Sequence, residues 1–261
     1  MSDTTPSAAN GWSDRDLGLR LVEIYGRMAA AQARAGRLQE PVTLIAVTKT
    51  VPVERILAAA ALGLTDLAEN RVQEARDKRE RLEALARSDS VTARLIASMR
   101  WELIGHLQTN KAGRAVELFE RVQSVDSLRL AEALNARVPV DAPALPVLLE
   151  VNIAGEESKS GFAPAEVESA ARDILELPAL HVQGLMTVAP IAGDPERARP
   201  VFRALRELRD HLRATLPHQH ATWRVLSMGM SDDFEIAIEE GATLVRIGRG
   251  LFGERPAPPQ P

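Results

Sequence analysis

A lysine follows one of the most apolar segments of the sequence, at a position where it could do chemistry. In LIAVTKT, residues 44–50, apolar and β-branched residues typical of a buried strand lead directly to Lys49. A lysine at a strand end can be a solvated structural residue. It can also be a nucleophile, because a desolvated amine has a lowered pKa and can form a Schiff base with a carbonyl group. The residues favour the second interpretation and leave the first open.

The use of lysine elsewhere strengthens this interpretation. Only four lysines occur, whereas the other 28 basic residues are arginines. Lys78 lies in a charged helical segment and is expected to be solvated at the surface. Lys111 and Lys159 follow later strand candidates, so together with Lys49 they are expected at one end of the fold. Lys111 and Lys159 are therefore candidates for a second, weaker attachment point.

Two glycine-containing turns near the C-terminus predict an anion site. In LSMGMSDDFEIAIEEG, a turn containing Gly229 leads into a helix start, where backbone N–H groups and the helix dipole favour phosphate. Ser227 and Ser231 would add hydroxyl donors. The segment RIGRG, with Gly248 and Arg249, offers a second such turn. The alternative is that Ser231 is an ordinary N-cap and the glycines serve only the turn.

A reactive lysine combined with a phosphate site has two common meanings. One is an aldolase acting on a sugar phosphate, and the other is pyridoxal phosphate, whose aldehyde joins to lysine. Arg246, one side-chain alternation before Gly248, is expected to point inward. Its partner could be a carboxylate such as Glu150 or Glu69, or it could be a pyridine nitrogen. An arginine there would keep that nitrogen unprotonated, because two positive charges would otherwise meet, and this weakens the ring as an electron sink.

The elements that must position these residues alternate between short β-rich runs and helical stretches. A helix with Ser13 as N-cap and Gly36 just after its end precedes the first strand and could cover the seam left by a missing last helix. The pattern predicts an α/β fold, a single (β/α)8 TIM barrel with an extra N-terminal helix, over an open doubly wound sheet. In a barrel the residues named above gather at the carboxyl ends of the strands. Eight strands are expected at 42–48, 65–70, 100–105, 121–126, 147–154, 181–188, 223–229 and 243–248.

Composition limits the classes of function. The 261 residues are 45% hydrophobic but only 3% aromatic, the net charge is -4, and there is no cysteine. These values do not favour nucleic-acid binding, disulfides or thiolate metal sites, and no run is apolar enough for a membrane span. We expect a cytoplasmic protein with no metal site. The expected organisation is one domain over 13–255 between disordered tails at 1–12 and 256–261.

Several motifs resemble those of the pyridoxal-phosphate homeostasis protein family, the YggS/PROSC group. They are AVTKT, ENRVQE, IGHLQTNK, VNIAGEESKSGF, GLMTVAP and LSMGMSDDFEIAIEEGATLVRIGRGLFG, in order between residues 44 and 253. The resemblance implies a barrel like the N-terminal domain of alanine racemase, with pyridoxal phosphate as a Schiff base on Lys49. The cofactor-binding residues that it implies are Lys49, Asn70, Met186, Ser227, Gly229, Arg246, Gly248 and Arg249. Arg249 departs from the family, which usually has Thr or Ser there, so a guanidinium would replace a hydroxyl.

The resemblance implies a role in intracellular control of pyridoxal phosphate rather than efficient catalysis. A racemase of related fold needs a second base, usually a tyrosine from another domain. Here Tyr25 is the one tyrosine and lies in the N-terminal helical segment, while His106 is a weaker candidate. We therefore expect a carrier or regulator, a monomer or weak dimer, that passes the cofactor to apo-enzymes. A weakly active amino-acid racemase or lyase, and a cofactor-free aldolase, remain the alternatives.

Overall fold

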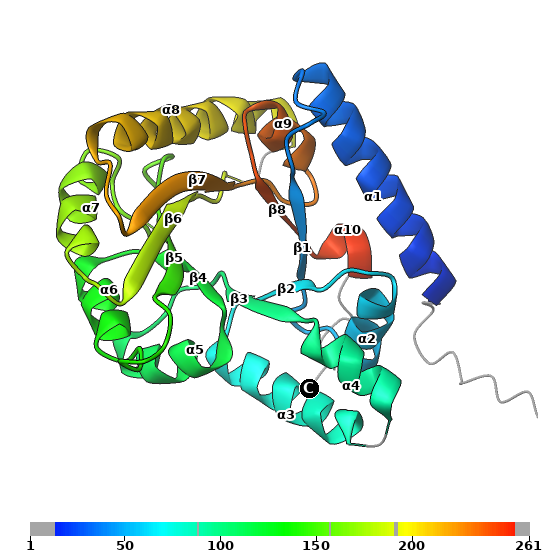
Figure 1. Ribbon diagram of the computed structural model, residues 1–261. Helices are drawn as coiled ribbons and strands as arrows, with labels where there is room; N and C mark the ends of the chain where they lie inside the picture. The colour runs from blue at the N-terminus through cyan, green and yellow to red at the C-terminus, as the bar shows by residue number, and fades with distance from the viewer. Residues whose placement is uncertain (1–13, 88, 157, 191–192, 254–261) are drawn as a thin grey trace, which may run out of the picture.

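The chain folds into a closed barrel of eight parallel strands in sequential order (Figure 1). The computed structural model describes residues 14–253 except 88, 157 and 191–192. The closed barrel confirms the predicted architecture over the open sheet, and every expected strand is present with shifts of a few residues at its ends. The strands are β1 Thr43–Val47, β2 Asp66–Glu69, β3 Arg100–Leu103, β4 Arg121–Val125, β5 Leu145–Glu150, β6 Leu180–Met186, β7 Ala221–Ser227 and β8 Leu244–Ile247.

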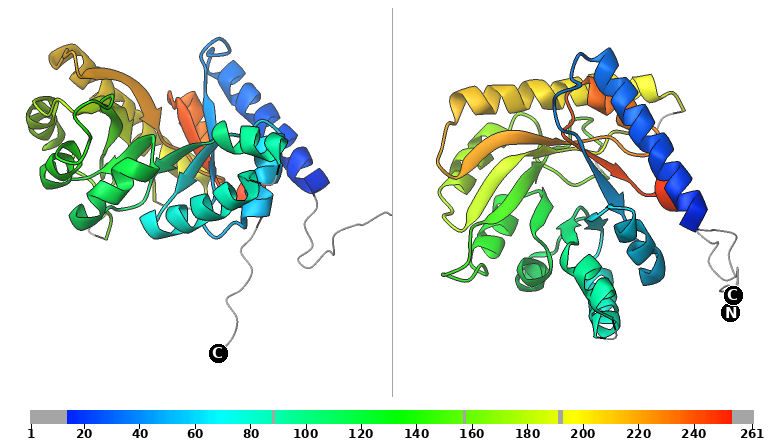
Figure 2. Two further views of the ribbon diagram at one scale, coloured as in Figure 1. Left: turned by 60° about the horizontal axis from the view of Figure 1, so that its bottom comes forward. Right: turned by 45° about the vertical axis from the view of Figure 1, so that its right-hand side comes forward.

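Helices surround the barrel and connect successive strands, as parallel pairing requires (Figures 1 and 2). The predicted tails at 1–12 and 256–261 lie outside the described residues, so the 13–255 boundary stays a prediction. Among the helices that the structure describes, none is long and apolar enough to cross a bilayer. The helices are α1 Asp14–Arg34, α2 Val53–Ala61, α3 Val72–Ala86, α4 Ser90–Ala97, α5 Ala112–Leu118, α6 Leu128–Asn135, α7 Val167–Leu175, α8 Arg199–Thr215, α9 Phe234–Glu239 and α10 Arg249–Phe252, with 3-10 turns η1 Thr109–Lys111 and η2 Pro195–Ala198.

Helix α1 covers the side of the barrel where β8 meets β1, as predicted. Only the single turn α10 follows β8, and α1 packs against α9, α10 and α2. Figure 2 shows α1, in dark blue, running across this side of the barrel. Its buried face repeats every three or four residues, at Leu17, Leu21, Ile24, Met28 and Ala31. The proposed cap Ser13 lies outside the described residues.

The barrel interior contains a small apolar cluster, separate from the larger core between strands and helices. It contains Ile45, Val47, Ala68, Leu148, Met186 and Leu244. Because side chains alternate along a strand, these residues show which later positions face inward. Lys49 follows Val47 by two, Asn70 follows Ala68 by two, and Glu150 follows Leu148 by two. The three polar side chains therefore project toward the mouth above this apolar layer.

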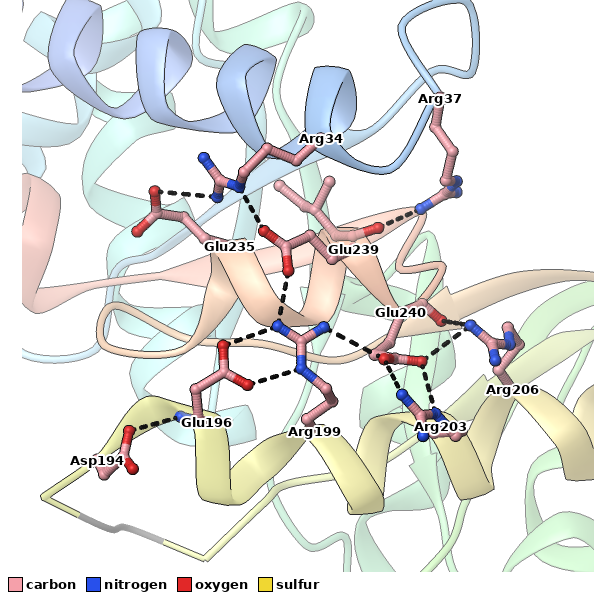
Figure 3. A network of polar contacts seen from close by, with 11 residues as sticks. Arg34, Arg37, Asp194, Glu196, Arg199, Arg203, Arg206, Glu235, Glu239 and Glu240 are labelled. Atoms are coloured by element: carbon pink, nitrogen blue, oxygen red, sulfur yellow. Dashed lines mark hydrogen bonds and ion pairs between the residues drawn. The ribbon is translucent and has the colours of Figure 1, made fainter.

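A network of charged side chains holds α8 and α1 to α9 (Figure 3). Glu240, which is only 4% exposed, accepts hydrogen bonds from Arg199, Arg203 and Arg206 at 3.2, 3.0 and 2.9 Å. Burial disfavours the Glu240 carboxylate, but the hydrogen bonds from the arginines outweigh it and lower its pKa. Glu240 therefore fixes the helix that follows the β7 turn, which belongs to the candidate site.

We expect Glu240→Gln to lower the free energy of unfolding by about 2 kcal/mol, because charge-assisted hydrogen bonds are lost while the partly exposed arginines can still meet water. Because the pKa of Glu240 is lowered in the fold, this contribution should be present at neutral pH. It should disappear as the pH falls through the folded-state pKa. Urea unfolding at several pH values measures both effects. Glu207→Gln, at an exposed position of α8, is the control and should change little. Equal losses in the two variants would contradict the role given to Glu240.

Candidate functional site

Lys49 lies immediately beyond β1, next to the end of β8. Ala46 is in register with Ile247, and a Cβ on Gly248 would lie 3.2 Å from the carbonyl oxygen of Val47. The backbones of the two strand ends are therefore in close contact where Lys49 begins. Lys49 is partly buried. The structure thus brings the predicted nucleophile and the RIGRG turn to the same sector of the rim.

Arg246 points into the barrel, as predicted, but its hydrogen-bond partners differ from the carboxylates considered above. Its guanidinium donates to Ser227 Oγ at 2.6 Å and to the Thr187 carbonyl at 2.8 Å. Glu69 lies outside the barrel on Lys78. Glu150 is near enough for its negative charge to favour the charged form of Arg246. Burial lowers the pKa of Arg246 to about 10, so the side chain is still cationic at neutral pH.

The hydroxyl of Ser227 belongs to this interior chain of hydrogen bonds. It donates to Gln123 Oε1 at 2.5 Å while accepting from Arg246. A serine hydroxyl has one proton to donate, and phosphate oxygens need donors. In this arrangement the Ser227 side chain supports Arg246. A phosphate contact from its Oγ stays a prediction, and it would require the bond to Gln123 to break.

The turns after β7 and β8 lie side by side. The Arg246 N–H donates to the Gly229 carbonyl at 3.0 Å, and the Gly250 N–H donates to Ser231 Oγ at 3.1 Å. Gly229 has a φ of 91°, and a Cβ there would lie 2.5 Å from the Ala237 side chain. Only glycine therefore fits this turn. We refer to residues 229–231 together with 248–250 as the rim cradle.

One expectation about the rim cradle needs correction, and another stays a prediction. Ser231 is not the N-cap of the helix, because α9 begins at Phe234 and Asp233 instead accepts the Met230 N–H at 2.6 Å. The serine was misplaced because three polar residues precede the first helical apolar residue. Arg249 does lie in the rim cradle, but in this structure its guanidinium forms an exposed ion pair with Asp232. Its contact with a phosphate stays a prediction.

Asn70 and Met186 complete the set of predicted residues. Asn70 is partly buried, and its side-chain oxygen has no hydrogen-bond partner among the described residues. The Asn70 backbone approaches Gly105 so closely that a Cβ on Gly105 would lie 2.3 Å from the Asn70 carbonyl oxygen. Met186 is fully buried in the interior cluster. A ligand ring with a hydrogen-bond donor could pair with the Asn70 side-chain oxygen and pack against apolar side chains such as Met186.

A cavity of about 140 Å³ opens between the ends of β3, β5 and β6. It is lined by His106, Glu150, Val151, Asn152, Lys159, Ser160 and Val188. His106 Nδ1 lies 2.6 Å from Asp126, and Lys159 pairs with Glu156 at 2.8 Å, whereas Lys111 is exposed on η1. The sequence suggests Glu150 only as a possible partner for Arg246, whereas the structure places it in the lining of this cavity. Its alternation with Leu148 was the signal that it faces the mouth.

Lys78 contradicts the sequence expectation. It is 9% exposed and binds Glu69 and Glu74 at 2.7 Å each, so it is not a solvated surface residue. The helical pattern of α3 placed it among charged residues, but its position on the helix turns it toward β2. No cluster of side chains suited to a metal ion occurs among the residues that the structure describes.

Curated relatives match this chain over nearly their whole length. Residues 23–256 match the family described as "Alanine racemase, N-terminal domain". The chain is 42% identical to "Pyridoxal phosphate homeostasis protein" of Aquifex aeolicus, covering 90% of this chain and 97% of that protein. It is 37% identical to the protein of the same name from Escherichia coli K12, covering 92% and 97%.

A solved structure agrees with these sequence relatives. PipY of Synechococcus elongatus, described with PLP bound, superimposes with a TM-score of 0.75 at 31% identity. The match covers 91% of this chain and all of PipY. The relatives carry the name of homeostasis proteins rather than of enzymes.

Proposed function

Because the chain belongs to the family of pyridoxal phosphate homeostasis proteins, within the alanine racemase N-terminal domain family, we propose that it binds pyridoxal 5′-phosphate and holds it covalently through Lys49. The observation that carries the proposal is the close contact between the ends of β1 and β8, because Lys49 follows β1 and part of the rim cradle follows β8. When bound, the cofactor would supply an aldehyde that can condense with a lysine amine with release of water.

The described residues fit this cofactor in three respects. The rim cradle contains Gly229, Gly248 and Gly250, and glycine-containing turns next to a helix start are a common phosphate-binding arrangement. The orphaned Asn70 oxygen and the apolar Met186 offer a polar and an apolar contact for a ring. Arg246 has five N–H donors, of which the hydrogen bonds to Ser227 and Thr187 use only part, so donors remain for a ring nitrogen.

We propose a carrier or regulator without efficient amino-acid chemistry. Arg246 is cationic at neutral pH and would keep a neighbouring ring nitrogen unprotonated, which weakens the ring as an electron sink. Tyr25, the base considered above, is on α1 at the outside of the barrel and 46% exposed. The proposed recipients are apo-enzymes that require the cofactor. We further propose a cytoplasmic location and a monomer or weak dimer.

The proposal predicts a yellow protein whose cofactor can be fixed by borohydride. Mass spectrometry of the reduced protein should find the added mass on Lys49, because that residue follows β1 where the strand contacts the end of β8. Lys49→Ala should lose both the colour and the adduct while retaining its thermal stability. If an adduct persisted in this variant on Lys111 or Lys159, that lysine and not Lys49 would be the attachment site.

Function is tested separately from attachment. Loaded protein mixed with an apo-enzyme should restore that enzyme's activity stepwise. Alanine and serine enantiomers should not be interconverted or consumed at ordinary enzyme rates. Turnover of either amino acid at such rates would favour the racemase or lyase alternative, and the absence of any adduct would favour the aldolase.

A further inference from the structure

Lys49 sits in a tight turn whose backbone is strained. The Val51 N–H donates to the Thr48 carbonyl at 2.8 Å, which makes Lys49 and Thr50 the two central residues of a β-turn. Thr50 has a φ of 64°. A β-branched residue rarely adopts a positive φ, and this turn position normally carries glycine or asparagine. Surrounding contacts must therefore hold the turn in place.

Three charged residues from β2 and α3, which we call the Glu69–Lys78–Glu74 triad, hold both sides of this turn. Lys78 Nζ donates to the Thr48 carbonyl at 2.6 Å, on the residue before Lys49. Glu74 Oε1 accepts the N–H of Thr50, on the residue after Lys49. Thr48 Oγ1 donates to Glu69 Oε1 at 2.6 Å. The backbone on each side of Lys49 is thus fixed by a different member of the triad.

The Lys78 ammonium uses all three of its N–H donors. Besides Thr48, Lys78 Nζ donates to Glu69 and Glu74 at 2.7 Å each, so its three N–H donors have three acceptors. Glu69 is fully buried and Lys78 nearly so. Burial raises the pKa of Glu69 even though Lys78 opposes the shift. For Glu74, the bonds from Lys78 and Thr50 outweigh burial and lower the pKa.

The triad lies on the opposite side of the strand from the site. Successive side chains of an extended chain point to opposite faces. Thr48 donates its hydroxyl to Glu69 of the triad, so we expect Lys49, the next residue, to face the mouth. Removing charges from water is costly, and a buried ion pair often contributes little net stability. Stability alone is therefore a weak reason for three ionisable groups at this point of the fold.

We propose that the Glu69–Lys78–Glu74 triad positions Lys49, by clamping the Thr48–Thr50 backbone so that the lysine amine is presented to the ligand at the rim cradle. This inference rests on the proposed attachment through Lys49. The triad touches neither the amine nor the cofactor, so its members are positioning residues. Their effect passes through two backbone groups, the carbonyl of Thr48 and the N–H of Thr50.

The test compares Lys78→Met with the double variant Glu69→Gln, Lys78→Met. The single change leaves Glu69 buried without its cation and is expected to destabilise the fold. The double change removes both charges and should recover most of the stability. Both variants lose the hydrogen bond from Lys78 Nζ to the Thr48 carbonyl. Both should therefore load pyridoxal phosphate onto Lys49 roughly ten- to a hundredfold more slowly. Amide exchange at Thr50 should accelerate in both. Arg81→Met, an exposed residue of α3, is the control and should match the wild type.

The readouts separate positioning from stability and from the proposed function. A double variant with wild-type stability, slow loading and fast Thr50 exchange supports positioning. A double variant that loads at the wild-type rate with wild-type exchange overturns it. If the wild type forms no Lys49 adduct, the proposed attachment fails, while Thr50 exchange in the Lys78 variants still reports whether the triad clamps the turn.

Discussion

Gly229→Ala is expected to weaken binding of pyridoxal phosphate by roughly ten- to a hundredfold, the equivalent of one lost hydrogen bond to a charged group at about 1.5–3 kcal/mol. The glycine has a φ of 91°, and an added Cβ would lie 2.5 Å from the Ala237 side chain and 2.9 Å from the Phe234 backbone. Neither neighbour can move without displacing the start of α9. The turn itself must shift, and the rim cradle shifts with it.

The comparison that isolates the phosphate is with pyridoxal, which has the same ring and aldehyde. Titrations followed by visible absorbance should show a large loss of affinity for the phosphorylated form and little change for pyridoxal. Gly26→Ala is the control, because Gly26 lies on exposed α1 with no atom near its added Cβ. Equal losses for both ligands would mean that the turn supports Lys49 or the fold and not a phosphate.

The barrel and the place of Lys49 could be predicted from sequence because both depend on local patterns. Buried parallel strands appear as short continuous apolar runs, and the residue after such a run lies at the rim. Lys49, Asn70 and Arg246 then follow from alternation alone. The adjacency of the two glycine-containing turns was also predictable, because consecutive strands of a barrel end side by side.

Long-range pairing was not predictable in the same way. Lys78 was expected in solvent because α3 is strongly charged, and helical periodicity does not reveal that one charged position faces a buried glutamate on β2. The same applies to Ser227, whose hydroxyl is engaged by Gln123, 104 positions earlier in the chain. The Ser231 cap was wrong because the Asp233 carboxylate competes for the turn's N–H groups.

Glu150 is the ionisable residue of the mouth for which we expect the strongest pH dependence. It ends β5, lines the cavity beside His106, and has one buried carboxylate oxygen without a partner among the described residues. Burial and the nearby Asp126 raise the pKa of Glu150 to about 7, against the opposing charges of Arg246 and His106. The charged form is therefore disfavoured in the fold.

The sign of the effect on stability follows from proton binding. In the unfolded chain Glu150 titrates near 4.5, so between about pH 4.5 and 7 the native state binds more protons than the unfolded state. The stabilising contribution of Glu150 to the free energy of unfolding is fully present below this window and is lost as the pH rises through about 7. A shift of this size corresponds to about 3 kcal/mol at pH values above both pKa values.

Glu150→Gln removes the titration while keeping the shape of the side chain. We expect the variant to be more stable than the wild type by up to about 3 kcal/mol near pH 8, and about equally stable near pH 4, where the carboxyl is protonated in both states. Urea unfolding of both proteins across this range measures the difference at each pH, so the titrations of all other groups cancel. Glu132→Gln, at an exposed position of α6, should show no such trend. A difference that stayed constant with pH would mean that Glu150 titrates alike in the folded and unfolded chain. In that case water or a cation must satisfy its buried oxygen at the mouth.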